Sequence, residues 1–200
     1  MASTDERSCT PAQRVCGAQH AGWLSTPMRK VINNPKRILR GLVGAGETVV
    51  DLGCGPGFFS LPLAQLVGDA GCVIAVDVQQ TMLEMLCVRA EKAGLARRIR
   101  PHRSSVDAIG VVEPADFVLA FYMLHEVSEK ARFLREVHDI LKEGGRFLLV
   151  EPIGHVSKAE YRQIVETAKE AGLVPVSVRH VAFSRAALFL RRDAGVNARS

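Results

Sequence analysis

The sequence is poor in long apolar runs and in aromatic residues. Its longest apolar run, residues 117–124, has eight residues, whereas a helix that spans a membrane needs about 20. Aromatic residues make up only 6% of the chain's 200 residues. The first ten residues, MASTDERSCT, lack the basic and apolar segments of a secretory signal peptide. We therefore expect no membrane span. The apolar content of 48% is sufficient for the core of one compact domain.

Cysteine is also scarce, and its spacing argues against two common structural uses. There are five cysteines, an odd number, and no two of them stand in the Cys-x-x-Cys spacing of many zinc sites. A disulfide framework in a secreted domain normally uses an even number of cysteines. The sequence therefore predicts no metal site, and it favours a reducing, cytoplasmic location.

Acidic residues are nearly absent from the first 46 positions, so the formal charge of +5 is unevenly distributed. Before Glu47 there are seven Lys or Arg residues and two acidic ones, while the remaining 19 basic and 19 acidic residues cancel. We predict a basic N-terminal arm or lid with a short helix over residues 1–46, followed by one domain over residues 47–200. A basic arm suits an anionic partner such as RNA, although it is more often a solvated surface.

From residue 48 onward, short apolar runs alternate with amphipathic stretches. The runs predict strands at 48–53, 72–78, 98–105, 115–123 and 146–152, and the stretches predict helices at 58–68, 81–95, 128–145 and 157–173. This alternation is typical of an α/β fold with a doubly wound, mostly parallel sheet. Two further strands, 175–184 and 186–192, lie too close together for a helical crossover. We therefore expect a seven-stranded sheet that ends in an antiparallel β-hairpin.

Three residues carry helix-end signals. Asn34 is followed by Pro35, a pair typical of a helix cap and its first turn. Ser128 is predicted to cap the helix after the fourth strand, and Gly144 is expected at the C-terminal end of that helix.

The stretch TVVDLGCGPGFFS places three glycines, Gly53, Gly55 and Gly57, directly after the first strand. Glycine here allows a sharp turn and lets a ligand approach the backbone closely. Dinucleotide-binding loops need a third small residue where this loop has Phe58, and phosphate-binding P-loops continue with Gly-Lys-Ser/Thr, which is missing here. A carboxylate at Asp51 is also a poor neighbour for a diphosphate. It suits a cationic ligand with an α-amino group, such as S-adenosylmethionine.

A second carboxylate, Asp77, ends the next predicted strand, 20 residues beyond Gly57. A carboxylate at this place can accept hydrogen bonds from both ribose hydroxyls of a nucleotide. Asp77 alone does not separate S-adenosylmethionine from NAD. Asp51 and Phe58 favour the former.

With these motifs the sequence resembles the class I S-adenosylmethionine-dependent methyltransferases. The matching pieces are VVDLGCGPGFFSLPLA, VIAVDVQQTMLEM, DFVLAFYMLHEV and LKEGGRFLLVEP, in the family's order. The resemblance is nearest to small single-domain enzymes such as quinone-biosynthesis and arsenite methyltransferases. It implies a Rossmann-like sheet and S-adenosylhomocysteine as the product. The cofactor residues that it implies are Asp51, Gly53, Cys54, Gly55, Gly57, Asp77, Val78, Gln79, Ser105, Val106, Asp107, Ala120 and Phe121.

Candidate catalytic side chains follow the fourth strand: Tyr122, His125 and Glu126. Methyl transfer from a sulfonium is an in-line displacement, so a general base is needed only if the acceptor stays protonated near neutral pH. An unperturbed histidine titrates near ~6.5 and could take that proton. His125 could equally have a structural role through a hydrogen bond to the backbone.

The acceptor is expected to be a small molecule, with Cys16, His20 and Trp23 of the arm as substrate contacts. Thiolates and imidazole are soft ligands, so a metalloid such as arsenite, or a thiol, is an alternative acceptor. Plain packing of these three residues is the third possibility.

A nucleic-acid methyltransferase is a further alternative, supported by the basic arm and by the run RRIRPHR at residues 97–103. However, the fourth strand is not followed by Asn-Pro-Pro-Tyr or Asp-Pro-Pro-Tyr, as base amino methylation would require. A third possibility is a protein that binds the cofactor without catalysing a reaction. The sequence gives no indication of the oligomeric state.

Overall fold

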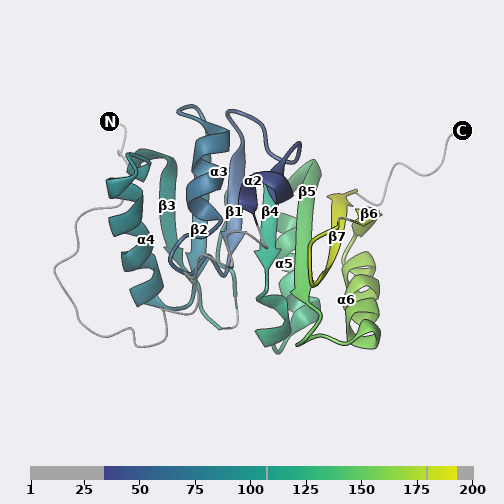
Figure 1. The fold of residues 1–200 in the computed structure, drawn as a ribbon. Coiled ribbons are helices and arrows are strands. Elements are labelled where there is room, and N and C mark those ends of the chain that lie inside the picture. Colours follow the sequence, from purple (N-terminus) through teal and green to yellow (C-terminus); the bar gives the residue numbers. More distant parts are fainter. Residues whose placement is uncertain (1–33, 107, 179, 193–200) are drawn as a thin grey trace, which may run out of the picture.

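The computed structural model describes residues 34–106, 108–178 and 180–192, and it contains a seven-stranded sheet with helices on both faces (Figure 1). The strand order is β3-β2-β1-β4-β5-β7-β6. The first five strands in this order pair in parallel, and β7 pairs antiparallel with both β5 and β6. The predicted α/β class and the C-terminal antiparallel hairpin are therefore confirmed. The strands are β1 (Thr48–Leu52), β2 (Cys72–Asp77), β3 (Ile99–Arg103), β4 (Ala115–Phe121), β5 (Leu141–Pro152), β6 (Leu173–Val178) and β7 (Ser184–Arg191).

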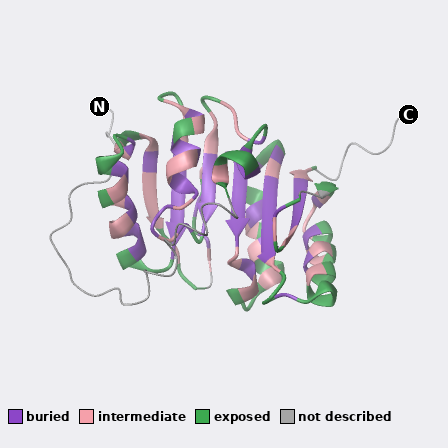
Figure 2. Ribbon diagram, in the orientation of Figure 1, coloured by how far each residue is buried: buried purple, intermediate pink, exposed green. Residues whose placement is uncertain are grey.

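Figure 1 shows α2, α3 and α4 in front of the sheet and α5 and α6 behind it. The helices are α2 (Pro35–Leu39), α3 (Ser60–Val67), α4 (Gln80–Lys92), α5 (Lys130–Ile140) and α6 (Lys158–Glu170), with 3-10 turns η2 (Ala96–Arg98) and η3 (Leu124–Glu126). The two faces bury separate hydrophobic clusters. The central strands are accordingly the most buried part of the molecule (Figure 2).

Strand β1 is central because it is apolar on both faces. Val49, Val50 and Leu52 are buried, and the strand pairs with β2 on one side and β4 on the other. The chain proceeds from β1 to β2 and β3 in one direction and then returns to β4 on the other side. The strand order thus reverses between β1 and β4, and in open α/β sheets ligands bind at such a point, beyond the carboxyl ends of the strands.

Side chains cap two of the helices, and the first of these caps was predicted from the sequence. Asn34 accepts a hydrogen bond from the backbone N–H of Lys36, with Pro35 in the first turn of α2. Ser157 and Glu160 form a reciprocal capping box at the start of α6.

The predicted ends of α5 were wrong. The helix begins at Lys130, and its cap position is Glu129, whose side chain makes no capping bond, instead of Ser128. It ends at Ile140 instead of near Gly144, because Leu141 turns to an extended conformation, pairs with Ala115 and is buried. Burial of Leu141 against the sheet therefore overrides the helical propensity of the next residues.

Gly57 holds α4 close to the glycine turn. A Cβ built at Gly57 would lie 2.3 Å from Cδ1 of Leu86, a fully buried side chain, and the backbone φ of Gly57 is +86°. Both the contact and the positive φ favour glycine.

Among the residues that the structure describes, no helix is both long and apolar enough to cross a bilayer.

We predict that Gly57→Ala destabilises the protein by about 1–3 kcal/mol more than Gly68→Ala. Gly68 also has a positive φ, +67°, but a Cβ there would meet nothing within 4 Å. The comparison therefore isolates the contact with Leu86 from the backbone strain. Urea-induced unfolding measures both variants, and equal losses would show that α4 can move away from the turn at little cost.

Candidate active site

A cavity of about 580 Å³ opens at the carboxyl edge of the sheet, over the ends of β1, β2 and β4. Its wall includes most of the residues that the sequence singled out. Of the predicted cofactor residues, it contains Asp51, Gly53, Cys54, Gly55, Asp77, Val78, Gln79, Ser105, Val106 and Phe121, and of the predicted catalytic residues, Tyr122 and Glu126.

Three predicted residues lie off this wall. They are Gly57, which lies against Leu86, Ala120, which is fully buried within β4, and His125, whose Nε2 lies 3.9 Å from Oε1 of Glu126. Four others, Asp107, Cys16, His20 and Trp23, lie outside the described residues. Ser104, Met82, Met123 and Phe133 line the cavity without having been predicted.

The glycine turn is tied to the neighbouring strand. The backbone N–H of Cys54 donates to the carbonyl of Val76 in β2 at 2.9 Å. The N–H of Gly55 donates to Oδ2 of Asp77, also at 2.9 Å. Gly55 has φ +52°, and a Cβ there would meet nothing within 4 Å, so the space beside the turn is open.

Asp51 is a buried carboxylate on this wall, with 2% of its surface exposed. Ser60, in the first turn of α3, donates its hydroxyl to Oδ2 at 2.6 Å. The pKa of Asp51 is raised to about 7, mainly by burial and to a smaller extent by the nearby charge of Asp77, while the hydrogen bond from Ser60 opposes the shift. No Lys or Arg pairs with Asp51 in the part of the chain that the structure describes.

Asp77 lies across the turn from Asp51, at the end of β2. Its Oδ2 accepts from the N–H of Gly55, and its Oδ1 accepts from the N–H of Gln79, both at 2.9 Å. Each carboxylate oxygen can accept a second hydrogen bond. The protein therefore orients Asp77 while leaving it able to bind a ligand's hydroxyl groups.

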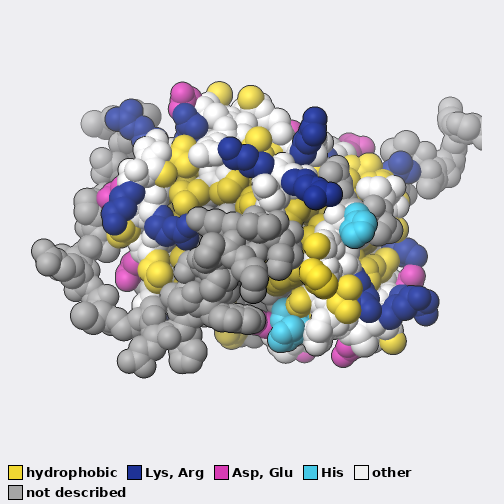
Figure 3. Space-filling view, viewed as in Figure 1, with side chains coloured by type: hydrophobic (Ala, Val, Ile, Leu, Met, Phe, Trp, Pro, Cys, Tyr) yellow, Lys and Arg dark blue, Asp and Glu magenta, His cyan; other side chains and the backbone are white. Residues whose placement is uncertain are grey.

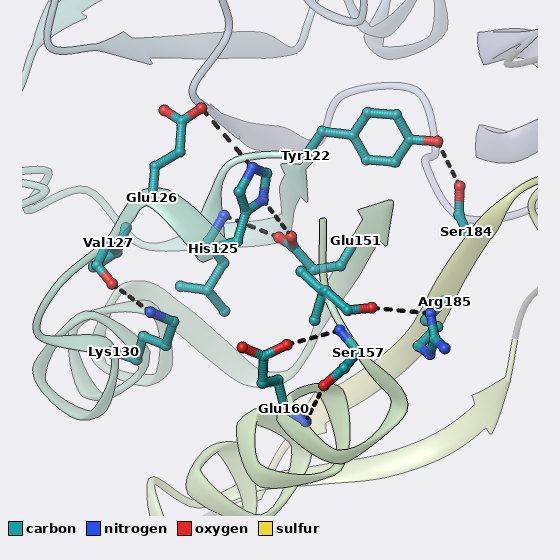
Figure 4. Close-up of polar contacts among 12 residues, drawn as sticks. Tyr122, His125, Glu126, Val127, Lys130, Glu151, Ser157, Glu160, Ser184 and Arg185 are labelled. Carbon is teal, nitrogen blue, oxygen red and sulfur yellow. Dashed lines mark hydrogen bonds and ion pairs between the residues drawn. The ribbon is translucent and has the colours of Figure 1, made fainter. Parts of the chain in front are cut away.

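His125 is held by Glu151, a residue that the sequence analysis missed. Glu151 ends β5 with no exposed surface, and its Oε2 lies 2.5 Å from Nδ1 of His125 (Figure 4). Its Oε1 accepts from the N–H of Leu124 at 2.9 Å. Burial raises the pKa of Glu151, while the contacts with His125 and Leu124 oppose that shift. The other ring nitrogen of His125, Nε2, lies 3.9 Å from Oε1 of Glu126, and Glu126 is a residue of the cavity wall.

Tyr122 has a strained backbone, with φ +61° in a non-glycine residue. Its hydroxyl lies 2.5 Å from Oγ of Ser184 in β7, and its ring packs 4.3 Å from that of Phe121 (Figure 4). Phe121 in turn packs against Phe59. Unusual φ values that persist in a packed structure often lie at functional sites, and here the strain places an aromatic ring on the cavity wall.

We predict that Asp51→Asn makes the protein more stable at pH 8 by about 2–4 kcal/mol. The folded-state pKa is raised above the unfolded value, so the unfolded chain loses this proton at lower pH than the folded one. Any stability that comes from protonated Asp51 is present below about pH 4 and is lost as the pH rises to about 7. Asn keeps an acceptor for Ser60 and removes the buried charge.

Urea-induced unfolding of wild type and variant at pH 4.5 and pH 8 measures this difference, with Asp139→Asn at an exposed position as the control. The advantage of Asp51→Asn should grow between the two pH values. A constant difference would mean that Asp51 titrates normally in the folded protein.

Comparison with known proteins agrees with this geometry. The model of the family described as "Methyltransferase domain" matches residues 49–145. The ubiquinone/menaquinone biosynthesis C-methyltransferase UbiE of Citrobacter koseri is 31% identical over 110 residues, which are 54% of this chain and 44% of that protein. The chain thus spans less than half the length of the curated relatives that it matches.

Solved structures share the fold over most of the chain. An S-adenosylmethionine-dependent methyltransferase from Aquifex aeolicus has a TM-score of 0.77 and 24% identity, over 85% of this chain and 96% of that one. Fibrillarin from Aeropyrum pernix, solved with natively bound S-adenosyl-L-methionine, has a TM-score of 0.65 and 17% identity, over 81% and 74% of the two chains. The matched domain, the motif order and the fold all support a class I S-adenosylmethionine-dependent methyltransferase.

Proposed function

We propose that the protein transfers a methyl group from S-adenosylmethionine to a small-molecule acceptor. The observation that carries the proposal is the placing of Asp51, the glycine turn and Asp77 around one cavity at the point where the strand order reverses. A buried carboxylate without a cationic partner suits the amino group of the cofactor's methionine part. A second carboxylate beside the turn suits its ribose.

The residues present fit this ligand better than a dinucleotide. Gly55 leaves open space beside the turn, which a ligand needs if it is to lie against the backbone. Asp51 and Asp77 lie close enough for the charge of one to raise the pKa of the other, and two carboxylates would repel a diphosphate. They would attract an ammonium and a sulfonium.

When bound, the cofactor supplies a methyl group on a sulfonium, which is a good leaving group. The chain's own residues then have to orient the acceptor and exclude water, and such positioning contributes on the order of 7–11 kcal/mol. Phe58, Phe121 and Tyr122 give this part of the wall its aromatic character. The hydrogen bond between the hydroxyls of Tyr122 and Ser184 holds one of these rings from β7.

For an acceptor that must lose a proton, we propose His125 as the general base, with Glu151 as a positioning residue. In this proposal the Nδ1–H of His125 donates a hydrogen bond to Glu151, and the unprotonated Nε2 is the nitrogen that accepts the proton. Because Nε2 lies beside Glu126, the acceptor's proton would be transferred to His125 at the edge of the cavity, where Glu126 is exposed. The same contacts also tie η3 to β5, so a purely structural role is the alternative that the experiment has to separate.

The proposal of a small-molecule acceptor is supported by the similarity to a quinone-biosynthesis C-methyltransferase. Support for a nucleic-acid acceptor would have to come from the basic residues. On the face in Figure 3, Lys and Arg side chains are scattered among hydrophobic and uncharged groups and form no continuous stripe. The arm's Cys16 and His20, on which a metalloid or thiol acceptor would depend, lie outside the described residues.

We predict that S-adenosylhomocysteine binds and that NAD does not, as measured by isothermal titration calorimetry. Asp77→Ala should weaken the binding of S-adenosylhomocysteine by at least about tenfold, because the two hydrogen bonds from the ribose hydroxyls to the carboxylate are lost. Asp139→Ala, which removes an exposed carboxylate on α5, is the matched control. Binding of NAD in place of S-adenosylhomocysteine would overturn the proposed function.

A second prediction concerns the base and uses an acceptor found in a panel of phenols, quinols and thiols. His125→Gln should lower kcat by about 100-fold with little change in KM, and Glu151→Gln should lower it by about tenfold and alter the pH profile. His155→Gln is the control, because that ring lies 5.5 Å from His125 and the described residues offer its side chain no hydrogen bond. Unchanged kcat in both variants at every pH would leave His125 and Glu151 with a structural role.

A further inference from the structure

A second cavity, of about 860 Å³, lies between α6 and the β6–β7 hairpin. It is distinct from the cavity over β1, β2 and β4, because no described residue lines both. Its wall is mostly apolar and includes the side chains Ile153, Val165, Val176 and Ala187, together with Tyr161. Ile153 and Val176 keep 50% and 44% of their surfaces exposed, so the apolar wall opens to solvent.

The charged side chains that line this cavity, as far as the structure describes the chain, are all basic. They are Lys158, Arg162 and Arg185, and His180 lies with them. Lys158 and Arg162 are exposed residues of α6 that form no ion pair with the described part of the chain. Elsewhere in the described residues some cations do have a carboxylate partner, as in the ion pairs that Arg98 and Arg146 form.

Arg185 is the most informative of these cations because it is half-buried. Its Nη1 donates to the carbonyl of Val156 at 3.1 Å, and this neutral group is its only acceptor among the described residues (Figure 4). A guanidinium has five N–H donors, and a partly buried charge normally has an anionic partner. Arg185 thus has donors left over beside an apolar cavity.

We infer that this second cavity binds an anionic amphipathic molecule, a carboxylate with an apolar body. The apolar wall would bury the body. Arg185 would hold the carboxylate through the fork of its guanidinium, and Lys158 and Arg162 would add to the attraction. The inference does not depend on the proposed methyl transfer, because it concerns residues outside the cofactor cavity.

The two cavities are nevertheless neighbours. Ser184 lines the second cavity and bonds to the hydroxyl of Tyr122, which lines the first. Binding experiments should therefore be carried out with S-adenosylhomocysteine at saturation, so that the probe does not enter the cofactor cavity.

The test measures binding of octanoate to the full chain by isothermal titration calorimetry. Octan-1-ol has the same apolar body without the charge, octylammonium has the opposite charge, and acetate has the charge without the body. Octanoate should bind at least about tenfold more tightly than each of these. Equal binding of octanoate and octan-1-ol, or no binding of octanoate, would overturn the inference.

Variants then locate the site. Arg185→Met keeps much of the apolar stem, and Lys158→Gln/Arg162→Gln alters two exposed positions where folding is not at risk. Each change should weaken the binding of octanoate by about tenfold. Arg185→Met removes a hydrogen bond to the carboxylate, and the double variant removes two nearby positive charges. Arg97→Gln removes an equal charge beside β3, at the opposite edge of the sheet, and should have no effect. Binding that is unchanged in the double variant and in Arg185→Met would contradict the proposed site, and S-adenosylhomocysteine binding separately reports whether the proposed function holds.

Discussion

The structure depends on one electrostatic constraint, a buried carboxylate at the end of the central strand. Asp51 is enclosed by β1, α3 and the glycine turn, and no cation of the described chain offsets its charge. Asp77 adds a second negative charge nearby. A site of this kind is costly to the free protein, and a cationic ligand would stabilise it. Under the proposed function, the feature that weakens the fold therefore also makes the cavity selective for cations.

The surrounding fold holds this site in place through contacts other than those of Asp51 and Asp77. Gly57 lets Leu86 of α4 approach the turn, and the Cys54 N–H ties the turn to β2. On the other side, Glu151 connects β5 to η3 through two hydrogen bonds. The rigidity of this edge of the sheet thus comes in part from residues that surround the cavity.

The sheet and the glycine turn could be predicted because their signals are local. The strand 48–52 and the carboxylates Asp51 and Asp77 are evident from a few adjacent residues. Glu151 could not be assigned in this way, since its contact with His125 crosses 26 residues and exists only because β5 lies beside β4. An acidic residue at the end of a predicted strand was visible, but its partner was not. The prediction of where α5 ends was wrong for a related reason. Burial of Leu141 against the sheet is a tertiary effect, which helix propensity does not take into account.

A crystal structure of the protein with S-adenosylhomocysteine tests the central claim most directly. The account predicts the amino group of the homocysteine part beside the Asp51 carboxylate and the ribose hydroxyls on Asp77. A ligand that binds in the same cavity with its amino group directed away from Asp51 would contradict the electrostatic role assigned to that residue.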